Sequence, residues 1–242
     1  MAAFKNIRTS NELIAYQKQV LSRTGGRTSK EARLFHYTNI NAMRNMLATQ
    51  SMWLSPAVDK NDILEAELIR SAGITDLCFS CFSRANQNIA MFKMYAPNPD
   101  GVMLSISFED AKMMLNQRPV LVEDGVILEE TDTVLYWIGV CYKDIESDKI
   151  TTPGQENHHI EKPLKELAGA IKLSGWEYEK EVRICGIKRL NSGQKISVKL
   201  PEKVEVVLCP GFDREKNKRE LSFLMQNGVG YKSSLYEDWI RL

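Results

Sequence analysis

The order of the short apolar segments along the chain constrains its fold more than any other feature of the sequence. Segments rich in apolar and β-branched side chains, separated by turn residues, predict short strands. They cover residues 34–37, 52–54, 76–82, 102–108, 134–142, 181–187, 204–209 and 229–236. Helical spacing, such as that of Ile40, Met43 and Leu47 after the N-cap candidate Asn39, lies between only some of these strands. Because regular strand–helix–strand alternation is missing, we expect an α+β fold with a mixed or antiparallel central sheet and flanking helices.

The length and the N-terminal pattern predict one domain with an appended segment. A chain of 242 residues with 43% hydrophobic side chains can bury one sizeable core. Leu13, Val20 and Leu21 have the spacing of an amphipathic helix over residues 10–23, and the polar connector after it contains two adjacent glycines. We therefore expect residues 1–30 to form an appended helix and linker, and residues 31–242 to form a single α+β domain.

Charge and cysteine content bear on partners and location. Lys and Arg number 32 and Asp and Glu number 31, so no global field attracts nucleic acid or an anionic membrane, and such a contact needs a local patch. No apolar run approaches the roughly 20 residues that span a bilayer, and the first residues lack the apolar segment of a signal peptide. The odd number of cysteines, 5, suits a reducing compartment. We expect a cytoplasmic protein with no membrane partner, and the sequence leaves its oligomeric state open.

Several common catalytic motifs do not occur in the sequence. There is no Walker loop, Gly-x-Gly-x-x-Gly, Gly-x-Ser-x-Gly or His-Glu-x-x-His, so the corresponding phosphotransfer, hydride-transfer, hydrolase and zinc-protease classes have no support. Cys78 and Cys81 would point to opposite faces of a strand, and no second pair follows. His158 and His159 lie in a polar stretch typical of exposed residues. We expect no metal ligands.

Four stretches of the chain carry a resemblance to a known family. They are Phe35-His36-Tyr37-Thr38; Asn61-Asp62 with Glu65; Cys78-Phe79-Ser80 through Met91, Tyr95-Ala96 and Gly101; and Trp176 with Glu179-Lys180-Glu181-Val182-Arg183. As an ordered set over about residues 33–236, they resemble the prokaryotic and phage family known as domain of unknown function 2971. The chain departs from the family pattern at Ile63, where the family has proline, and at Phe92, where it has tryptophan. The family name implies no activity.

A more distant resemblance implies a chemistry. The opening strand with His36, a tyrosine in mid-chain and a glutamate on a late strand are similar to the His-Tyr-Glu pattern of ADP-ribosyltransferases, including the DNA-modifying toxins. This resemblance implies an ADP-ribosyltransferase-like fold and an ADP-ribosyltransferase activity, or an NAD-consuming hydrolase on the same scaffold. NAD would be the substrate, and a nucleic acid or protein is a possible acceptor. It also implies a role in phage–host or toxin-type conflict.

The candidate residues suit cleavage of the bond between nicotinamide and ribose, which passes through a cation-like ribose. His36 can bind the ribose on the adenosine side, Tyr95 can stack on nicotinamide, and a carboxylate can bind the other ribose. Strand alternation over residues 176–184 would place Glu177, Glu179, Glu181 and Arg183 on one face. Because Arg183 can orient Glu181, we select Glu181 as the first catalytic carboxylate and Glu179 as the second.

The full set of candidates has alternative interpretations. The predicted catalytic residues are Glu181, Glu179, His36 and Tyr95, and the predicted NAD-binding residues are His36, Tyr37, Thr38, Ser80, Ser83, Asn88 and Arg183. We expect His36, Tyr95 and Glu181 to converge on one cleft. Each residue also fits a structural role, such as a hydrogen-bonded core side chain or an exposed acidic strand edge. Asn61, Asp62 and Glu65 fit either a capped helix start or a substrate loop.

Two other classes of function stay open at this point. A non-catalytic module that binds a nucleotide or nucleic acid would have a basic groove beside His36. A metal-dependent nuclease would have clustered carboxylates that hold a divalent cation.

Overall fold

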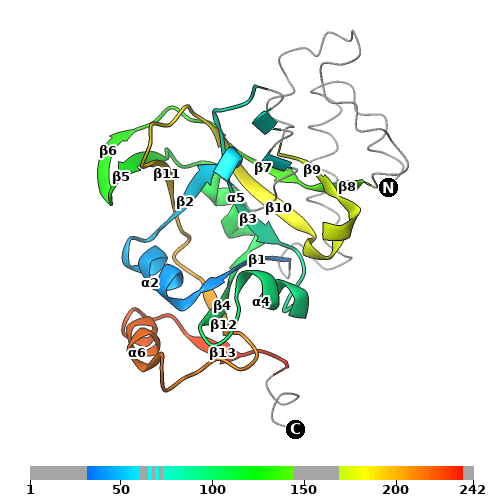
Figure 1. Ribbon diagram of the computed structural model, residues 1–242. Helices are drawn as coiled ribbons and strands as arrows, with labels where there is room; N and C mark the ends of the chain where they lie inside the picture. The colour runs from blue at the N-terminus through cyan, green and yellow to red at the C-terminus, as the bar shows by residue number, and fades with distance from the viewer. Residues whose placement is uncertain (1–31, 60–64, 67–68, 71–72, 144–168, 237–242) are drawn as a thin grey trace. The chain divides into compact units, whose positions relative to one another are not determined.

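The computed structural model describes residues 32–59, 65–66, 69–70, 73–143 and 169–236 (Figure 1). These residues form two compact units. The first unit holds the described residues of Trp53–Cys81 and Gln117–Ser197. The second unit holds those of Arg27–Met52, Phe82–Asn116 and Val198–Leu242.

Some sequence predictions concern residues outside the described part of the chain. They are the helix at residues 10–23, the linker up to residue 30, Asn61, Asp62 and the pair His158-His159. The division into an appended segment and one α+β domain over residues 31–242 also stays a prediction.

The second unit is built around the antiparallel strands β1 and β4. β1 (Arg33–Asn39) pairs with β4 (Gly101–Ser107) along its whole length. β12 (Glu205–Leu208) is antiparallel to β4 on its other side, and β13 (Tyr231–Ser233) is parallel to β12. Nearly every residue of β4 is buried, as expected for a strand that is covered on both faces.

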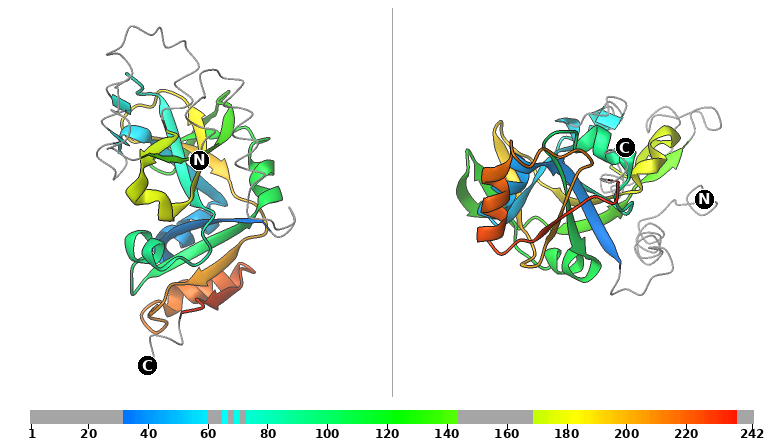
Figure 2. Two further views of the ribbon diagram at one scale, coloured as in Figure 1. Left: turned by 90° about the vertical axis from the view of Figure 1, so that its right-hand side faces the viewer. Right: turned by 90° about the horizontal axis from the view of Figure 1, so that it is seen from below.

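Short helices accompany these strands. They are α2 (Ile40–Ala48), α4 (Ile89–Tyr95), α5 (Phe108–Met114) and α6 (Lys218–Gln226). Asn39 caps α2 as predicted, because its Oδ1 accepts a hydrogen bond from the Ala42 N–H at 2.8 Å. Ser107 caps α5 in the same way through the Asp110 N–H. α6 packs on α2 and lies next to β13 in Figure 1 and in the left view of Figure 2.

Gly101 begins β4 at a point where the backbone leaves no room for a side chain. A Cβ atom there would lie 1.7 Å from the carbonyl oxygen of Ala96 and 2.9 Å from that of Pro97. Glycine alone permits this close approach of two backbone segments. It thereby fixes the end of α4, which carries Tyr95, against the start of β4.

The first unit contains most of the remaining strands. They are β2 (Ser51–Pro56), β3 (Leu77–Ser83), β5 (Val120–Glu123), β6 (Val126–Glu130), β7 (Leu135–Gly139), β8 (Cys141–Lys143), β9 (Ile171–Leu173), β10 (Glu181–Ile187) and β11 (Gln194–Lys199). The ends of β2, β3 and β11 belong to the second unit. β10 pairs with β3 and with antiparallel β7, beside which it runs in Figure 1. β5 is antiparallel to β6 and β11, whereas β8 is parallel to β9.

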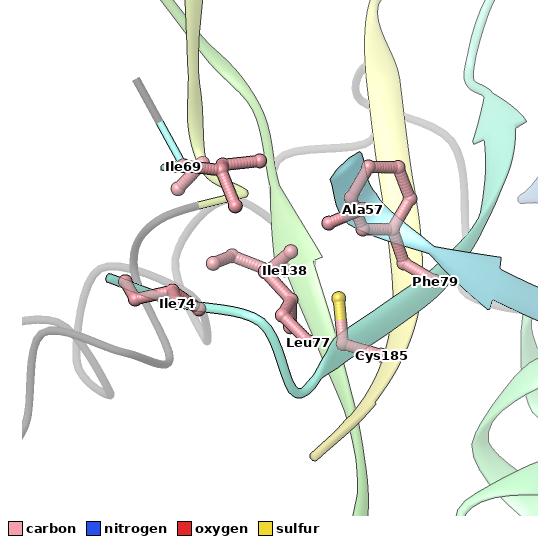
Figure 3. Close-up of a cluster of buried hydrophobic side chains, with 8 residues drawn as sticks. Ala57, Ile69, Ile74, Leu77, Phe79, Ile138 and Cys185 are labelled. Carbon is pink, nitrogen blue, oxygen red and sulfur yellow. The ribbon is translucent and has the colours of Figure 1, made fainter. Parts of the chain in front are cut away.

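The apolar core of the first unit lies against β10 (Figure 3). Its buried members are Ala57 of the 3₁₀ helix η2 (Ala57–Asp59), Ile69, Ile74, Leu77, Phe79, Ile138, Ala170 and Cys185. Phe79, Ile138 and Cys185 come from β3, β7 and β10, so three strands meet in one cluster. Since burial contributes about 0.8 kcal/mol per methylene, this cluster holds β10 in place and fixes the position of its first residue, Glu181.

The predicted fold class is confirmed. Most strand pairs are antiparallel, β8–β9 and β12–β13 are parallel, and short helices accompany the strands. Some boundaries differ. The last helix, α6, begins at Lys218, because Asp213 Oδ1 accepts from the Lys216 N–H and caps a turn before the helix. Of the strand predicted over residues 229–236, only Tyr231–Ser233 is paired.

Candidate active site

The end of a 3₁₀ helix and the start of β10 bring two glutamates into the protein interior. The helix η4 (Ser174–Glu179) is followed by Lys180, whose backbone is left-handed with a φ of 45°. Glu179 and Glu181 are buried, whereas Glu177 and Lys180 are exposed. The prediction that strand alternation extends back to Glu177 is therefore wrong. Side chains of a 3₁₀ helix return to the same direction about every three residues, whereas those of a strand do so every two.

Arg183 is the centre of a buried ion-pair network and is 1% exposed. Its Nε and Nη2 donate to the two carboxylate oxygens of Glu181 at 2.7 and 3.1 Å. Its Nη1 and Nη2 donate to the carboxylate of Glu65, the Nη2 bond being 3.0 Å long, and Nη1 also donates to the Gly169 carbonyl at 2.6 Å. The Phe79 ring covers the guanidinium at 4.2 Å. These bonds engage all five N–H donors of the guanidinium, so Arg183 orients Glu181, as the sequence predicted.

Glu181 is held as an ionised carboxylate although it is only 4% exposed. Burial by itself would raise its pKa. The charge and hydrogen bonds of Arg183, the ammonium of Lys172 and the thiol of Cys81 instead hold the pKa of Glu181 well below its usual range. The backbone N–H of Glu181 donates to the Tyr142 hydroxyl at 2.7 Å, which anchors the first residue of the strand.

Strands β8 and β9 deliver two of these groups to Glu181. Their parallel register places Tyr142 opposite Lys172. The Lys172 Nζ donates to Glu179 Oε2 at 2.7 Å and lies 3.0 Å from Glu181 Oε2. Burial would lower the pKa of Lys172, but the carboxylates of Glu181 and Glu179 raise it above its usual value, so the ammonium stays charged. One cation is thus shared by two carboxylates.

The network has more carboxylates than cations, and two half-buried aromatic rings of η4, which we call the aromatic border, lie at its edge. Its members, which we call the charged cluster, are Glu65, Lys172, Glu179, Glu181 and Arg183. Three carboxylates thus face two cations among the residues that the structure describes. Trp176 and Tyr178 of η4 are half-buried, with ring centroids 6.1 Å apart. The Trp176 ring lies 5.2 Å from the Lys172 Nζ.

This arrangement favours some kinds of chemistry over others. A fixed carboxylate in a buried setting stabilises positive charge that develops nearby, since solvent screens it little. The space between the carboxylates, where a divalent cation would bind, is occupied by the guanidinium and the ammonium. Within the described ranges, no group of His, Cys, Asp and Glu residues has an arrangement that could hold a metal ion.

In the second unit, His36 and Thr38 share one face of β1 by strand alternation. Both are half-buried. The His36 ring lies 5.5 Å from the ring of Phe82 in a tilted arrangement. His36 therefore lies on a strand, as predicted, and its role in binding NAD stays a prediction.

Tyr37 and Asn88 form a buried hydrogen-bonded link in the second unit. The Tyr37 hydroxyl donates to the Ala85 carbonyl at 2.8 Å and accepts from the Asn88 N–H at 3.0 Å. Burial raises the pKa of Tyr37 to about 12. The Asn88 side chain caps α4, and the Tyr37 ring meets Phe92 edge to face at 5.1 Å. These contacts give Tyr37 and Asn88 a defined structural role, and Phe92 packs in the core.

The two candidate serines and Tyr95 differ in their surroundings. Ser83 is buried, and its Oγ accepts from the Ala85 N–H at 2.9 Å. Tyr95 is half-buried at the end of α4. Ser80 belongs to the first unit, where alternation along β3 places it on the face opposite Cys81, whose thiol contacts Glu181.

The candidate residues are divided between the two units. His36 and Tyr95 belong to the second unit and Glu181 to the first. Their convergence on one cleft stays a prediction. Within the first unit, the structure brings together Glu179, Glu181 and Arg183.

Three residues of this site did not enter the predicted set of site residues: Glu65, Lys172 and Tyr142. Glu65 had been assigned to a capped helix start or a substrate loop, yet its neighbours Ala66 and Ile69 are buried, and a charged side chain at a buried helical position needs a partner. Lys172 stands alone in the apolar run 170–173, which is the same kind of signal. Their partners are not readable from the sequence, because Glu65 and Arg183 are 118 positions apart.

Comparison with known proteins supports the family resemblance over part of the chain. Residues 91–184 match the model of the family described as "Protein of unknown function (DUF2971)". The matched range includes Tyr95, Gly101 and the motif around Glu181, whereas Phe35–Thr38 and Glu65 precede it. No curated protein matches the chain.

A solved structure has a distantly similar fold. It is DarT of Thermus sp. 2.9 in complex with ADP-ribosylated single-stranded DNA. The two chains are 12% identical, and the match covers 86% of this chain and 95% of that chain with a TM-score of 0.37. In the part of the chain that the structure describes, no helix has the length and apolar character to span a membrane.

Proposed function

We propose that this protein cleaves the bond between nicotinamide and ribose in NAD and transfers ADP-ribose to an acceptor, with Glu181 as the catalytic carboxylate. The observation that supports this most is a carboxylate that is buried, fixed by Arg183 and kept ionised, with Lys172 linking it to the half-buried Trp176 ring. A neutral or freely moving carboxylate would stabilise a cationic transition state much less.

The charge balance of the reaction matches that of the charged cluster. The nicotinamide ring of NAD is a cation, and it leaves as a neutral molecule with the electron pair of the broken C–N bond. The positive charge passes to the ribose until the acceptor forms its bond to the anomeric carbon and gives up a proton. The three carboxylates of the cluster exceed its two cations, so the cluster favours positive charge at both stages.

The hydrogen bonds of Glu181 indicate where a substrate hydroxyl would enter. A carboxylate has about four acceptor positions. Arg183 fills two of them, Lys172 fills one and the thiol of Cys81 fills one. A thiol is a weak donor, so a ribose hydroxyl can replace it. Cys81 is half-buried, and we infer that the substrate reaches Glu181 from its side.

The remaining parts of the proposal follow the sequence predictions. His36 would bind the ribose on the adenosine side, and Tyr95 would stack on the nicotinamide. Glu179 would assist Glu181 or orient the acceptor, which is a nucleic acid, a protein or, in a hydrolase, water. Cytoplasmic action in phage–host or toxin-type conflict belongs to the same proposal.

The test is release of nicotinamide from NAD, measured by liquid chromatography, with single-stranded DNA, protein extract or neither added. We expect release by the wild type and a loss of about 100- to 1,000-fold in kcat for Glu181→Gln, the scale of removing one fixed charge-stabilising group. Glu177→Gln is the matched control, because Glu177 is an exposed glutamate of the same segment. It should keep wild-type activity.

Stability has to be checked in parallel. Glu181 is buried, so Glu181→Gln removes buried hydrogen bonds to charged groups and should cost about 1–3 kcal/mol. Two carboxylates and two cations remain, so no buried charge is left without a counter-ion. Equal loss of activity in Glu177→Gln and Glu181→Gln would reject the assigned role. Metal-dependent cleavage of nucleic acid without any NAD turnover would support the nuclease alternative.

A further inference from the structure

Lys172 occupies the position that joins the two candidate catalytic carboxylates. Its Nζ lies 2.7 Å from Glu179 Oε2 and 3.0 Å from Glu181 Oε2. These two glutamates come from different elements, η4 and β10, and the left-handed Lys180 separates them. Two carboxylates that approach one point repel each other unless a cation lies between them. Lys172 supplies that cation.

Lys172 also supports the aromatic border of the site. The Trp176 ring lies over its ammonium at 5.2 Å, a cation–π contact that favours one orientation of the ring. Lys172 lies on β9, which pairs with β8. The hydroxyl of Tyr142 on β8 accepts a hydrogen bond from the Glu181 N–H. One short strand pair therefore fixes the backbone of Glu181, the side chains of both glutamates and Trp176.

We propose that Lys172 is a positioning residue of the site: it holds Glu179 and Glu181 together as ionised carboxylates against Trp176. This inference rests on the proposed function for its effect on catalysis. Lys172 does not itself need to touch the substrate, since its ammonium is engaged by the two carboxylates and the ring.

The charged and titratable groups around Lys172 come from every neighbouring element. They are Glu179 and Tyr178 from η4, Glu181 and Arg183 from β10, and Tyr142 from β8. Farther from Lys172, Glu65 binds Arg183, and the Cys81 thiol binds Glu181. In Lys172→Gln, Glu179 loses the ammonium that donates to it at 2.7 Å, and Glu181 loses the same ammonium but keeps Arg183. At least one carboxylate then takes up a proton at a higher pH.

The first readout is the pH profile of nicotinamide release. In Lys172→Gln the acidic limb of kcat/KM should move upward by about one pH unit or more, because an opposite charge near a carboxylate typically shifts its pKa by that amount. Lys172→Arg should restore most of the wild-type profile. Lys180→Gln, an exposed lysine in the same segment, should leave it unchanged. A lower rate with an unmoved acidic limb would overturn the proposal and leave Lys172 a merely structural role.

A second readout does not depend on activity, so it separates this inference from the proposed function. Urea unfolding of the wild type and Lys172→Gln is followed at several pH values. The stability deficit of the variant should shrink as the pH falls, because protonation relieves the carboxylate pair. A deficit that is the same at every pH would overturn the positioning role, whereas a wild type that never releases nicotinamide would overturn only the proposed function.

Discussion

Replacing Arg183 by methionine should destabilise the protein by about 3–5 kcal/mol at neutral pH, the cost of removing one partner from a buried ion pair. Arg183 makes five hydrogen bonds and is the shared cation of Glu65 and Glu181. Without Arg183, the charged cluster keeps three buried carboxylates and one cation, Lys172, which contacts Glu179 and Glu181. Methionine keeps an unbranched apolar side chain next to Phe79, so the loss reports mainly on charge. Domains are typically stable by about 5–15 kcal/mol, so the variant should still fold.

The pH dependence of this loss distinguishes charge from packing. The folded-state pKa of Glu181 is lowered, so its contribution in the wild type is present above the unfolded pKa of about 4.3 and is lost as the pH falls through the folded value. In Arg183→Met, Glu181 is left without the guanidinium that lowers its pKa most, so that pKa rises. Lowering the pH therefore destabilises the variant less than the wild type. The difference in unfolding free energy between the two proteins should shrink as the pH falls from about 7.5 to about 5.

The assay is urea denaturation followed by circular dichroism at both pH values. Arg118→Met is the matched control, because Arg118 lies 3.8 Å from Glu130 in an exposed ion pair with its side chain 80% accessible. Such a pair contributes about 0–1 kcal/mol. A loss below about 1 kcal/mol for Arg183→Met, or a larger loss that does not change with pH, would refute the electrostatic argument.

Two predictions concern the second unit. Gly101→Ala should destabilise the protein by more than about 4 kcal/mol, because the new Cβ would lie 1.7 Å from the Ala96 carbonyl oxygen. The control Gly230→Ala, whose Cβ would have no atom within 4 Å, should change the melting temperature little. Comparable melting temperatures for the two variants would contradict the close approach at Gly101. Tyr37→Phe should cost about 1–3 kcal/mol in urea denaturation, because the Ala85 carbonyl and the Asn88 N–H lose their buried partner, and a neutral effect would show that water replaces the hydroxyl.

Local signals explain why the start of the described chain was predictable. The side chain of Asn39 caps α2, and Ile40, Met43 and Leu47 are its buried residues, as their spacing indicated. Glu181–Ile187 was also predicted with the observed bounds, since its residues have strong strand propensity. In both cases, the residues that define the element are neighbours in the sequence.

Two local signals were missed or misread. Asp124 and Gly125 have φ values of 48° and 81° and join β5 to β6, which is the conformation that an Asp-Gly hairpin predicts, yet this hairpin was not predicted. Strand alternation was also assumed for residues 176–180, ahead of the predicted strand. Nothing in the sequence indicates that Lys180, rather than a glycine, adopts a left-handed backbone there.

The composition of the charged cluster was only partly predictable. The pair Glu181 and Arg183 follows from strand alternation, since residues two apart share a face. Glu65 and Lys172 join them through the tertiary fold, and the spacing of a single sequence does not encode which distant charges meet. The burial of Glu181 was likewise not predictable, because an exposed acidic edge has the same pattern.

The central claim, that Glu181 acts on NAD, is tested most directly by separating binding from cleavage. Calorimetry would measure NAD binding, and proton NMR of the same samples would follow free nicotinamide, for the wild type and for Glu181→Gln. The account predicts that both proteins bind NAD within about tenfold of each other and that only the wild type releases nicotinamide at an appreciable rate. Undiminished release by a folded Glu181→Gln protein, or no NAD binding by the wild type at millimolar concentration, would contradict it.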